Sequence, residues 1–169
     1  VRSMRGGATI GTPDQIMRLV NAGLHQICNI YGLTETYGNC SVTDASDELE
    51  LRLSSIGKPL DGFDIRVIDS ATDRECASGE IGEIRVKGHV LKEYYKDPER
   101  TREAFDDDGF FRTGDQGRFD DDGYLYIVGR SKDMIISGGE NIYPSEVEGV
   151  LGAHPQIKDV AVIGVPHDK

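Results

Sequence analysis

The sequence predicts a mixed α/β protein made of three consecutive parts. A capped helical pattern followed by a short apolar run suggests that residues 1–54 are the end of a large α/β layer. Residues 55–130 contain two segments in which apolar and polar residues alternate, together with two Asp-Gly turn signals, so we expect a β-rich subdomain there. A strand–helix–strand series of apolar runs then indicates that residues 131–169 begin a small α+β C-terminal domain.

The first part contains the strongest helical pattern of the chain. Thr12 suits an N-cap and Gln15 completes a capping box, so we predict a helix over residues 12–23 with one apolar stripe. The following run, residues 25–30, is typical of a strand, and it leads into a predicted loop over residues 31–38.

The middle part is dominated by strand and turn signals. Residues 63–69 and 83–88 alternate apolar and polar side chains, which predicts two half-buried strands. A short helix is expected over residues 97–105, with its first residue, an aspartate, as N-cap. Two DDDG sequences, at 106–109 and 120–123, place turns before aromatic strands.

The last part returns to apolar runs. We predict a short buried strand over residues 134–137, a helix over 144–154 with apolar residues on one face, and a buried strand over 157–165.

The bulk composition excludes several classes of protein. The 169 residues carry a formal net charge of −11, which argues against a nucleic-acid partner because phosphates repel an acidic surface. Three cysteines without metal-ligand spacing indicate no disulfide framework and a cytoplasmic location. No apolar stretch approaches the about 20 residues of a transmembrane helix. Because the chain does not begin with Met, we expect both ends to be cuts through a longer protein. The sequence makes no prediction of the oligomeric state.

The motif YGLTET, residues 31–36, is the first candidate for chemistry. After a turn at Gly32, Thr34 offers a hydroxyl and a backbone N–H to a phosphate, and Glu35 offers hard oxygens to Mg²⁺. A polar loop with a helix N-cap explains the same residues, and the residue pattern alone favours this plainer interpretation.

Two further motifs offer weaker signals. In RTGD, Asp115 follows a predicted tight turn and is placed to accept hydrogen bonds from ribose hydroxyls, to which Arg130 is placed to donate. Taken alone, each of these residues is better explained more simply, as part of a surface turn and as a solvated arginine. Gly138 and Gly139 permit a positive φ or a close approach of the backbone to a ligand, and a flexible strand-to-helix loop is the alternative.

In chain order, these segments resemble the adenylate-forming superfamily of acyl-CoA synthetases, luciferases and peptide-synthetase adenylation domains. The segments that carry the resemblance are GGA (6–8), YGLTET, GKPLDGFDIRVID (57–69), GEIRVKG, YYKDPERTREAF, DGFFRTGD, GYLYIVGRSKD and GGENIYPSEVE. The resemblance implies a large N-terminal domain that ends in a small distorted β-barrel, then a hinge and a small mobile C-terminal domain.

The resemblance also implies a nucleotide-binding set: Gly7, Ala8, Tyr31, Gly32, Thr34, Asp115 and Arg130. Within this set Gly7 and Ala8 would border the adenine and Tyr31 would stack near it, while Asp115 and Arg130 would hold the ribose.

Other roles are implied in the same way. Thr34 and Glu35 would be the catalytic pair that serves the α-phosphate and Mg²⁺. Lys132 would be the hinge, and Gly138 and Gly139 would line the tunnel for the pantetheine of CoA.

The implied reaction has two halves. A carboxylate attacks the α-phosphorus of ATP to give an acyl-adenylate and pyrophosphate, and the thiol of CoA then displaces AMP. SGGENIYPSEVE looks like the CoA ligases, so we expect a fatty acyl-CoA synthetase. A non-catalytic nucleotide-binding relative, an aryl- or amino-acid-activating enzyme and a luciferase-like enzyme are the alternatives.

The family pattern also has two parts outside this chain. Its Ser/Thr/Gly-rich phosphate loop would precede Val1 and its adenylation lysine would follow Lys169, so we expect residues 1–169 alone to be inactive.

Overall fold

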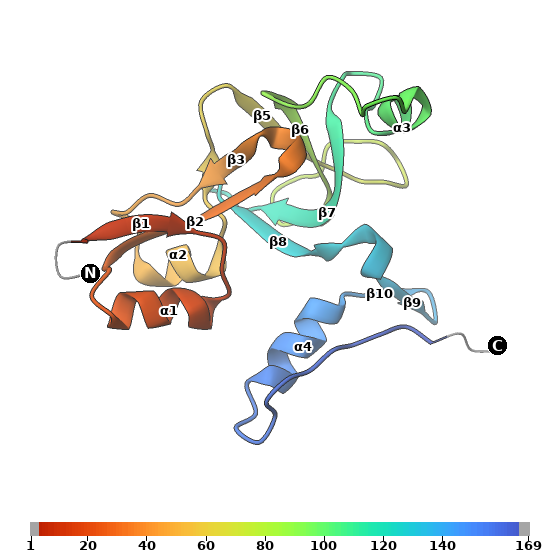
Figure 1. Ribbon diagram of the computed structural model, residues 1–169. Helices are drawn as coiled ribbons and strands as arrows, with labels where there is room; N and C mark the ends of the chain where they lie inside the picture. The colour runs from red at the N-terminus through yellow and green to blue at the C-terminus, as the bar shows by residue number, and fades with distance from the viewer. Residues whose placement is uncertain (1–3, 166–169) are drawn as a thin grey trace.

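The computed structural model describes residues 4–165 (Figure 1). Residues 1–3 and 166–169, at the outer ends of the predicted segments 1–54 and 131–169, lie outside the described residues. The described chain has mixed α/β structure with two four-stranded sheets and one two-stranded sheet. The predicted fold class is confirmed, although the β-rich part is an open sheet rather than a closed barrel over residues 4–165.

The first sheet has the strand order β1-β2-β3-β4. Its strands are β1 (Gly6–Thr9), β2 (Gln26–Leu33), β3 (Gly38–Val42) and β4 (Lys58–Pro59). β1 runs parallel to β2, and the other neighbours are antiparallel. The helices α1 (Pro13–Asn21) and α2 (Leu49–Ser54) contact β2, and Figure 1 shows them on the same side of β1 and β2.

The predicted helix over residues 12–23 is confirmed as α1. Gln15 donates its backbone N–H to Thr12 Oγ1 at 3.4 Å, and Thr12 donates its own N–H to Gln15 Oε1 at 3.0 Å. These two bonds form the predicted capping box, which gives partners to N–H groups that the first helical turn leaves free. Within the apolar stripe of α1, Ile16 is completely buried.

β2 is longer than predicted. The predicted loop over residues 31–38 is wrong at its start, because β2 continues through Leu33 before a single 3-10 turn at Thr34–Thr36. The extension is stabilised by antiparallel pairing with β3, which runs from the pair Ile30–Val42 to the pair Leu33–Gly38. A polar, Gly-containing sequence therefore becomes strand because it has a hydrogen-bonded neighbour.

The second sheet is an antiparallel meander. Its strands, in sheet order and in chain order, are β5 (Phe63–Ile68), β6 (Gly82–Gly88), β7 (Phe111–Phe119) and β8 (Leu125–Arg130). α3 (Pro98–Glu103) lies in the connection from β6 to β7 and is capped by Asp97, as predicted. The two Asp-Gly turns are confirmed, since Gly109 and Gly123 both have φ +79°.

The predicted half-buried pattern of residues 83–88 is wrong. Gly82–Val86 of β6 is buried on both faces, because the polar side chains Glu83 and Arg85 form an ion pair at 3.1 Å beneath neighbouring loops. Alternation of residue types predicts the strand but does not reveal that both of its faces are covered.

The main hydrophobic core lies between the two four-stranded sheets. Its buried members come from β2, β3, β5, β6 and β8 and from the segment before β4: Tyr31, Cys40, Ile56, Ile65, Val67, Ile84, Val86 and Leu125. The packing joins the strand that carries YGLTET to the sheet that carries RTGD, so the two motifs are held at a fixed separation.

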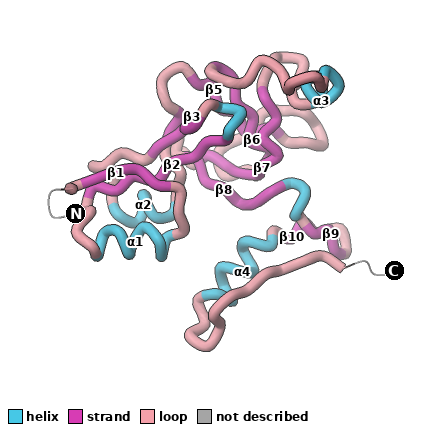
Figure 2. Tube along the Cα trace, viewed as in Figure 1, coloured by secondary structure: helices cyan, strands magenta, loops and turns pink. Residues whose placement is uncertain are grey.

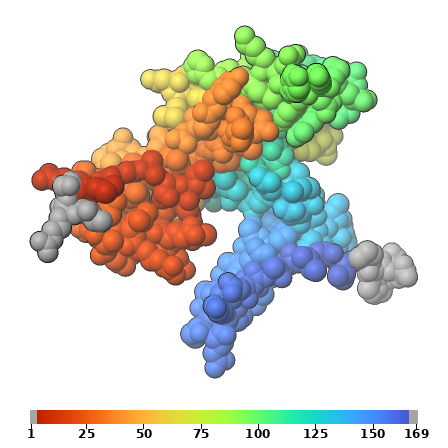
Figure 3. Space-filling view, viewed as in Figure 1, coloured from red at the N-terminus to blue at the C-terminus, as the bar shows by residue number. Residues whose placement is uncertain are grey.

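The C-terminal part comprises β9 (Ile135–Ser137), β10 (Glu140–Ile142) and α4 (Pro144–Gly152). The strand and the helix are confirmed, but the predicted burial of 134–137 is wrong, since Ile136 is 69% exposed. β9 pairs only with β10 in the described chain, and a two-stranded ribbon covers little of its own surface. Figure 3 shows this part projecting from the body of the molecule.

The predicted buried strand over residues 157–165 is also wrong. This segment is drawn as a loop that runs beside α4 (Figure 2). It contacts the helix through the Val162 N–H, which donates to Glu148 Oε1 at 2.8 Å. Its apolar residues favour a strand, but a strand requires a hydrogen-bonded neighbour, and no strand between residues 4 and 165 pairs with it.

Candidate functional site

The turn after β2 is fixed by a buried threonine. Thr36 Oγ1 accepts a hydrogen bond from the Leu33 N–H at 2.9 Å and donates to the Gly38 carbonyl at 2.7 Å. Tyr37 closes the turn with φ +54°, a left-handed conformation that is unusual for a residue other than glycine. Thr36 therefore has a structural role, and the turn presents the exposed Thr34 and the half-buried Glu35 at the surface.

RTGD lies within β7 rather than in the separate tight turn predicted for it. Between two register pairs with β6, strand β7 has three residues, Thr113–Asp115, where β6 has only Ile84. Gly114 takes φ +72° in this irregularity. Bulges of this kind redirect a side chain and are frequent beside active sites. Here the bulge brings Asp115 opposite Arg130 of β8.

Asp115 is the buried centre of a polar cluster that joins the two sheets. The Tyr31 hydroxyl donates to Asp115 Oδ2 at 2.7 Å, and Arg130 Nε lies 3.1 Å from Oδ1. Asp115 is only 6% exposed, so its charge depends on these partners. Burial, together with the neighbouring carboxylate, raises the pKa of the Tyr31 phenol, which keeps it a hydrogen-bond donor at neutral pH.

A cleft of about 770 Å³ opens above this cluster. Four of the predicted site residues line it: Gly32, Thr34, Glu35 and Arg130. Asp115 does not line the cleft itself, but its ion pair with Arg130 connects it to the lining. The structure therefore brings together side chains from the turn after β2, from β7 and from β8 that are distant in the sequence.

The remaining predicted site residues lie elsewhere. Gly7 and Ala8 are in β1, in register with β2, and do not line the cleft. Lys132 is in an exposed 3-10 turn after β8. Gly138 and Gly139 form the turn between β9 and β10 with φ +63° and +90°, the first of the two possibilities predicted for them. Their proposed contacts with CoA stay predictions.

Several cleft residues were not predicted. Ile10, Leu33, Tyr37, Gly38 and Asn39 complete the lining. Leu33 lies within the YGLTET motif, and the last three follow it directly, so recognition of a β2–β3 hairpin would have identified all four. A further residue, Tyr94, donates its hydroxyl to Glu35 Oε1 at 3.0 Å, and no pattern in the sequence connects the two.

The cleft fits Mg²⁺ only together with phosphate. No group of three or more metal-ligating side chains occurs in the described part of the chain. Glu35 supplies one carboxylate at the cleft, and Mg²⁺ is commonly held by one or two carboxylates plus the oxygens of a bound phosphate group. This donor set is consistent with a metal that enters with a nucleotide.

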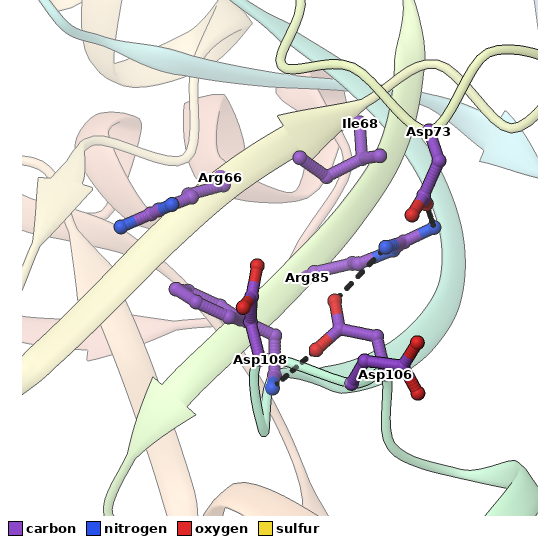
Figure 4. A pocket seen from close by; sticks show the side chains of 8 residues that line it. Arg66, Ile68, Asp73, Arg85, Asp106 and Asp108 are labelled. Carbon is purple, nitrogen blue, oxygen red and sulfur yellow. Dashed lines mark hydrogen bonds and ion pairs between the residues drawn. The ribbon is translucent and has the colours of Figure 1, made fainter.

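A second, smaller hollow of about 60 Å³ lies at the edge of the β5–β8 sheet (Figure 4). Arg85 fills its base and is bound to Asp73 at 2.8 Å and to Asp106 at 2.9 Å. Since these charged groups form ion pairs with one another, they have a structural role in supporting β6.

A family model described as AMP-binding enzyme matches residues 1–95. The long-chain-fatty-acid–CoA ligase FadD13 of Mycobacterium tuberculosis is 44% identical over 165 residues, which cover 97% of this chain and 32% of that ligase. The chain thus spans about a third of the length of the curated relatives it matches.

Solved structures give the same result. O-succinylbenzoate coenzyme A synthetase (MenE) of Bacillus subtilis in complex with AMP is similar with a TM-score of 0.86 and 35% identity, over 99% of this chain and 34% of that enzyme. The same enzyme in complex with ATP and magnesium ion is similar with a TM-score of 0.82 and 34% identity, over 96% and 34% of the two chains. Between residues 4 and 165 of this chain, no helix has the length and apolarity needed to cross a bilayer.

Proposed function

Because this chain belongs to the AMP-binding enzyme family, we propose that its cleft holds the AMP moiety of ATP. The observation that carries the proposal is the convergence of Thr34, Glu35 and Arg130 on one cleft, with Asp115 paired to Arg130 below. We propose further that the whole protein is an AMP-forming acid–CoA ligase, whose substrates are a small carboxylic acid, ATP and CoA.

Each side chain has a task that follows from its chemistry. A carboxylate offers about four acceptor positions, and Tyr31 and Arg130 use only two of those on Asp115. Asp115 therefore retains the capacity to accept from two ribose hydroxyls. Thr34 would donate to the α-phosphate, and the half-buried Glu35 would hold Mg²⁺ with the phosphates.

The adenine would lie toward β1 and β2. Gly7 and Ala8 are next to β2 through their register pairs, and Ile10, just beyond β1, lines the cleft. Tyr31 is almost fully buried and does not itself line the cleft. This placement supports a role for Tyr31 in holding Asp115, and its contact with adenine stays a prediction.

In the proposed first step, a carboxylate oxygen of the acid forms a bond to the α-phosphorus of ATP, and the bond to pyrophosphate breaks. In the second step, the sulfur of CoA forms a thioester with the acyl carbon, and AMP leaves. When bound, Mg²⁺ would neutralise phosphate charge. The chain's own residues position the nucleotide and stabilise the charge that develops on the phosphate oxygens.

We propose that residues 1–54 and 55–130 form the end of a large AMP-binding domain and that residues 131–169 are the hinge and the start of a small domain. Lys132 would be the hinge residue, and Gly138 and Gly139 would line the CoA tunnel. The projection of the C-terminal part and the exposed apolar side chains of α4 support this division, because such side chains are normally covered.

The proposed acid is a fatty acid, supported by the similarity to FadD13. The similarity to O-succinylbenzoate coenzyme A synthetase favours a second candidate, a carboxylic acid with an aromatic ring. We also propose a cytoplasmic location, which is consistent with the three free cysteines at Cys28, Cys40 and Cys76.

Pyrophosphate release by the full-length protein across a panel of acids, with and without CoA, tests the proposal. Release with fatty acids and CoA-dependent formation of a thioester are expected. Pyrophosphate release with aryl acids but not with fatty acids would make an aryl acid the proposed substrate in place of a fatty acid. Nucleotide binding without pyrophosphate release in the presence of any acid would favour a non-catalytic relative.

A further inference from the structure

Tyr94 reaches the proposed metal ligand from a distant part of the chain. It lies in the connection between β6 and α3, 59 residues from Glu35, and its hydroxyl donates to Glu35 Oε1 at 3.0 Å. The contact crosses from one sheet to the other, so it depends on the fold and not on local sequence.

The same connection holds Glu35 at a second point. The Leu91 N–H donates to the Glu35 carbonyl at 2.7 Å, which fixes the backbone of the turn that presents the carboxylate. Among the described residues, none donates a hydrogen bond to the second carboxylate oxygen, Oε2, and Glu35 lines the cleft. One oxygen is therefore used by the protein, and the other is available to a ligand.

Tyr94 is itself held by α3. Its N–H donates to Thr101 Oγ1 at 2.9 Å, and the guanidinium of Arg100 lies 4.0 Å from the centre of its ring. Asp97, which caps α3, is tied to the same turn because its N–H donates to the Tyr94 carbonyl at 3.1 Å. With the backbone and the ring both constrained, the hydroxyl oxygen is held within hydrogen-bond distance of Glu35.

We propose that Tyr94 is a positioning residue that orients the Glu35 carboxylate for Mg²⁺ bound with ATP. The proposal rests on the proposed function of the cleft. Carboxylates that bind metals are commonly oriented by a hydrogen bond to the oxygen that the metal does not use, and loss of such a partner typically weakens metal binding about tenfold or more. Tyr94 would thus act through Glu35 and would not touch the nucleotide.

The test uses binding to the full-length protein. ATP binding is titrated at increasing Mg²⁺, and AMP binding is titrated without Mg²⁺, for the wild type and Tyr94→Phe. This substitution keeps the ring over Arg100 and removes only the hydroxyl. Tyr95→Phe is the matched control, because Tyr95 is the adjacent residue, is 85% exposed, and donates no hydrogen bond within the described structure. Thr101→Val loosens the support of Tyr94 without altering the hydroxyl, and provides a second variant.

We expect Tyr94→Phe to raise the Mg²⁺ concentration for half-maximal ATP binding about tenfold, with AMP affinity within about twofold of the wild type. Thr101→Val should shift it in the same direction by less, and Tyr95→Phe should not shift it. An unchanged Mg²⁺ requirement in Tyr94→Phe would overturn the proposal, and so would an equal loss of AMP affinity, which would indicate general support of the cleft. If the wild type binds neither nucleotide, the proposed function itself fails.

Discussion

Arg85 should be one of the most stability-sensitive residues of the chain, and replacement by methionine tests this expectation. The side chain is 3% exposed and lies among three carboxylates, as Figure 4 shows for two of them. Its nitrogens are 2.8 Å from Asp73, 3.1 Å from Glu83 and 2.9 Å from Asp106. Methionine retains much of the apolar stem and removes the charge.

The magnitude follows from which partners are buried. The side chain of Asp73 is 70% exposed, so water solvates its charge and its ion pair with Arg85 contributes little to stability. Glu83 and Asp106 are each about one-tenth exposed, so the variant leaves two carboxylates in a poorly hydrated site. Breaking a buried pair by removing one partner costs about 3–5 kcal/mol. Arg112 remains 3.4 Å from Glu83, which places our expectation at the lower end.

Urea denaturation of the full-length protein measures the change, provided that the slope of the transition is the same in wild type and variant. Arg74→Met is the matched control, because Arg74 makes two short contacts with Glu80, at 2.7 and 3.0 Å, but both side chains are exposed. The control should leave the midpoint almost unchanged. Equal shifts in the two variants would refute the reasoning that burial, and not contact geometry, determines the loss.

Three further predictions concern stability. Burial raises the pKa of Asp106, but the Phe110 N–H and Arg85 outweigh it and hold that pKa below its ordinary value. A carboxylate whose pKa is lowered in the folded state stabilises the protein at pH values above its unfolded-state pKa, and this stabilisation is lost as the pH falls through the folded-state pKa. The difference in free energy of unfolding between wild type and Arg85→Met should therefore narrow as the pH falls below about 4, measured in acid titrations of unfolding. Gly32→Ala should destabilise the protein and abolish AMP binding, because the added Cβ would lie 1.7 Å from a backbone carbonyl oxygen of β3. Gly149→Ala has open space around the added Cβ, so thermal melting should show no change or a small stabilisation. Thr12→Ala should lower the free energy of unfolding by about 1 kcal/mol through loss of the N-cap.

The features that the sequence predicts well are determined by neighbouring residues. The capping box of Thr12 and Gln15 and the positive φ at Gly109 depend on interactions within four residues of chain, so the pattern contains the necessary information. The same is true of the left-handed pair Gly138 and Gly139.

The features that it misses depend on partners far away in the chain. The extension of β2 through Leu33 requires β3, and the covered polar face of β6 requires Asp106 to reach Arg85. The segment 157–165 has the composition of a strand without a pairing partner in the described structure. Composition and periodicity record burial tendencies, but they do not record which surfaces meet.

The site shows the same division. The motifs identified Thr34, Glu35, Asp115 and Arg130 by resemblance, while the residue patterns alone left simpler explanations open for each. The convergence of Thr34, Glu35 and Arg130 on one cleft, with Asp115 paired to Arg130, is a property of the packed sheets. Tyr94 had no motif to mark it, because its role follows from a contact across 59 residues.

The claim that Asp115 holds the ribose of a bound AMP is tested most directly by comparing AMP with 2′,3′-dideoxy-AMP. Hydrogen bonds to a charged group contribute about 1.5–3 kcal/mol, so the wild-type full-length protein should prefer AMP by about tenfold or more in isothermal titration. Asp115→Asn should reduce that preference to near one, while Asp121→Asn, at an exposed position of the β7–β8 turn, should retain it. A full preference for AMP in Asp115→Asn would contradict the assignment of the cleft.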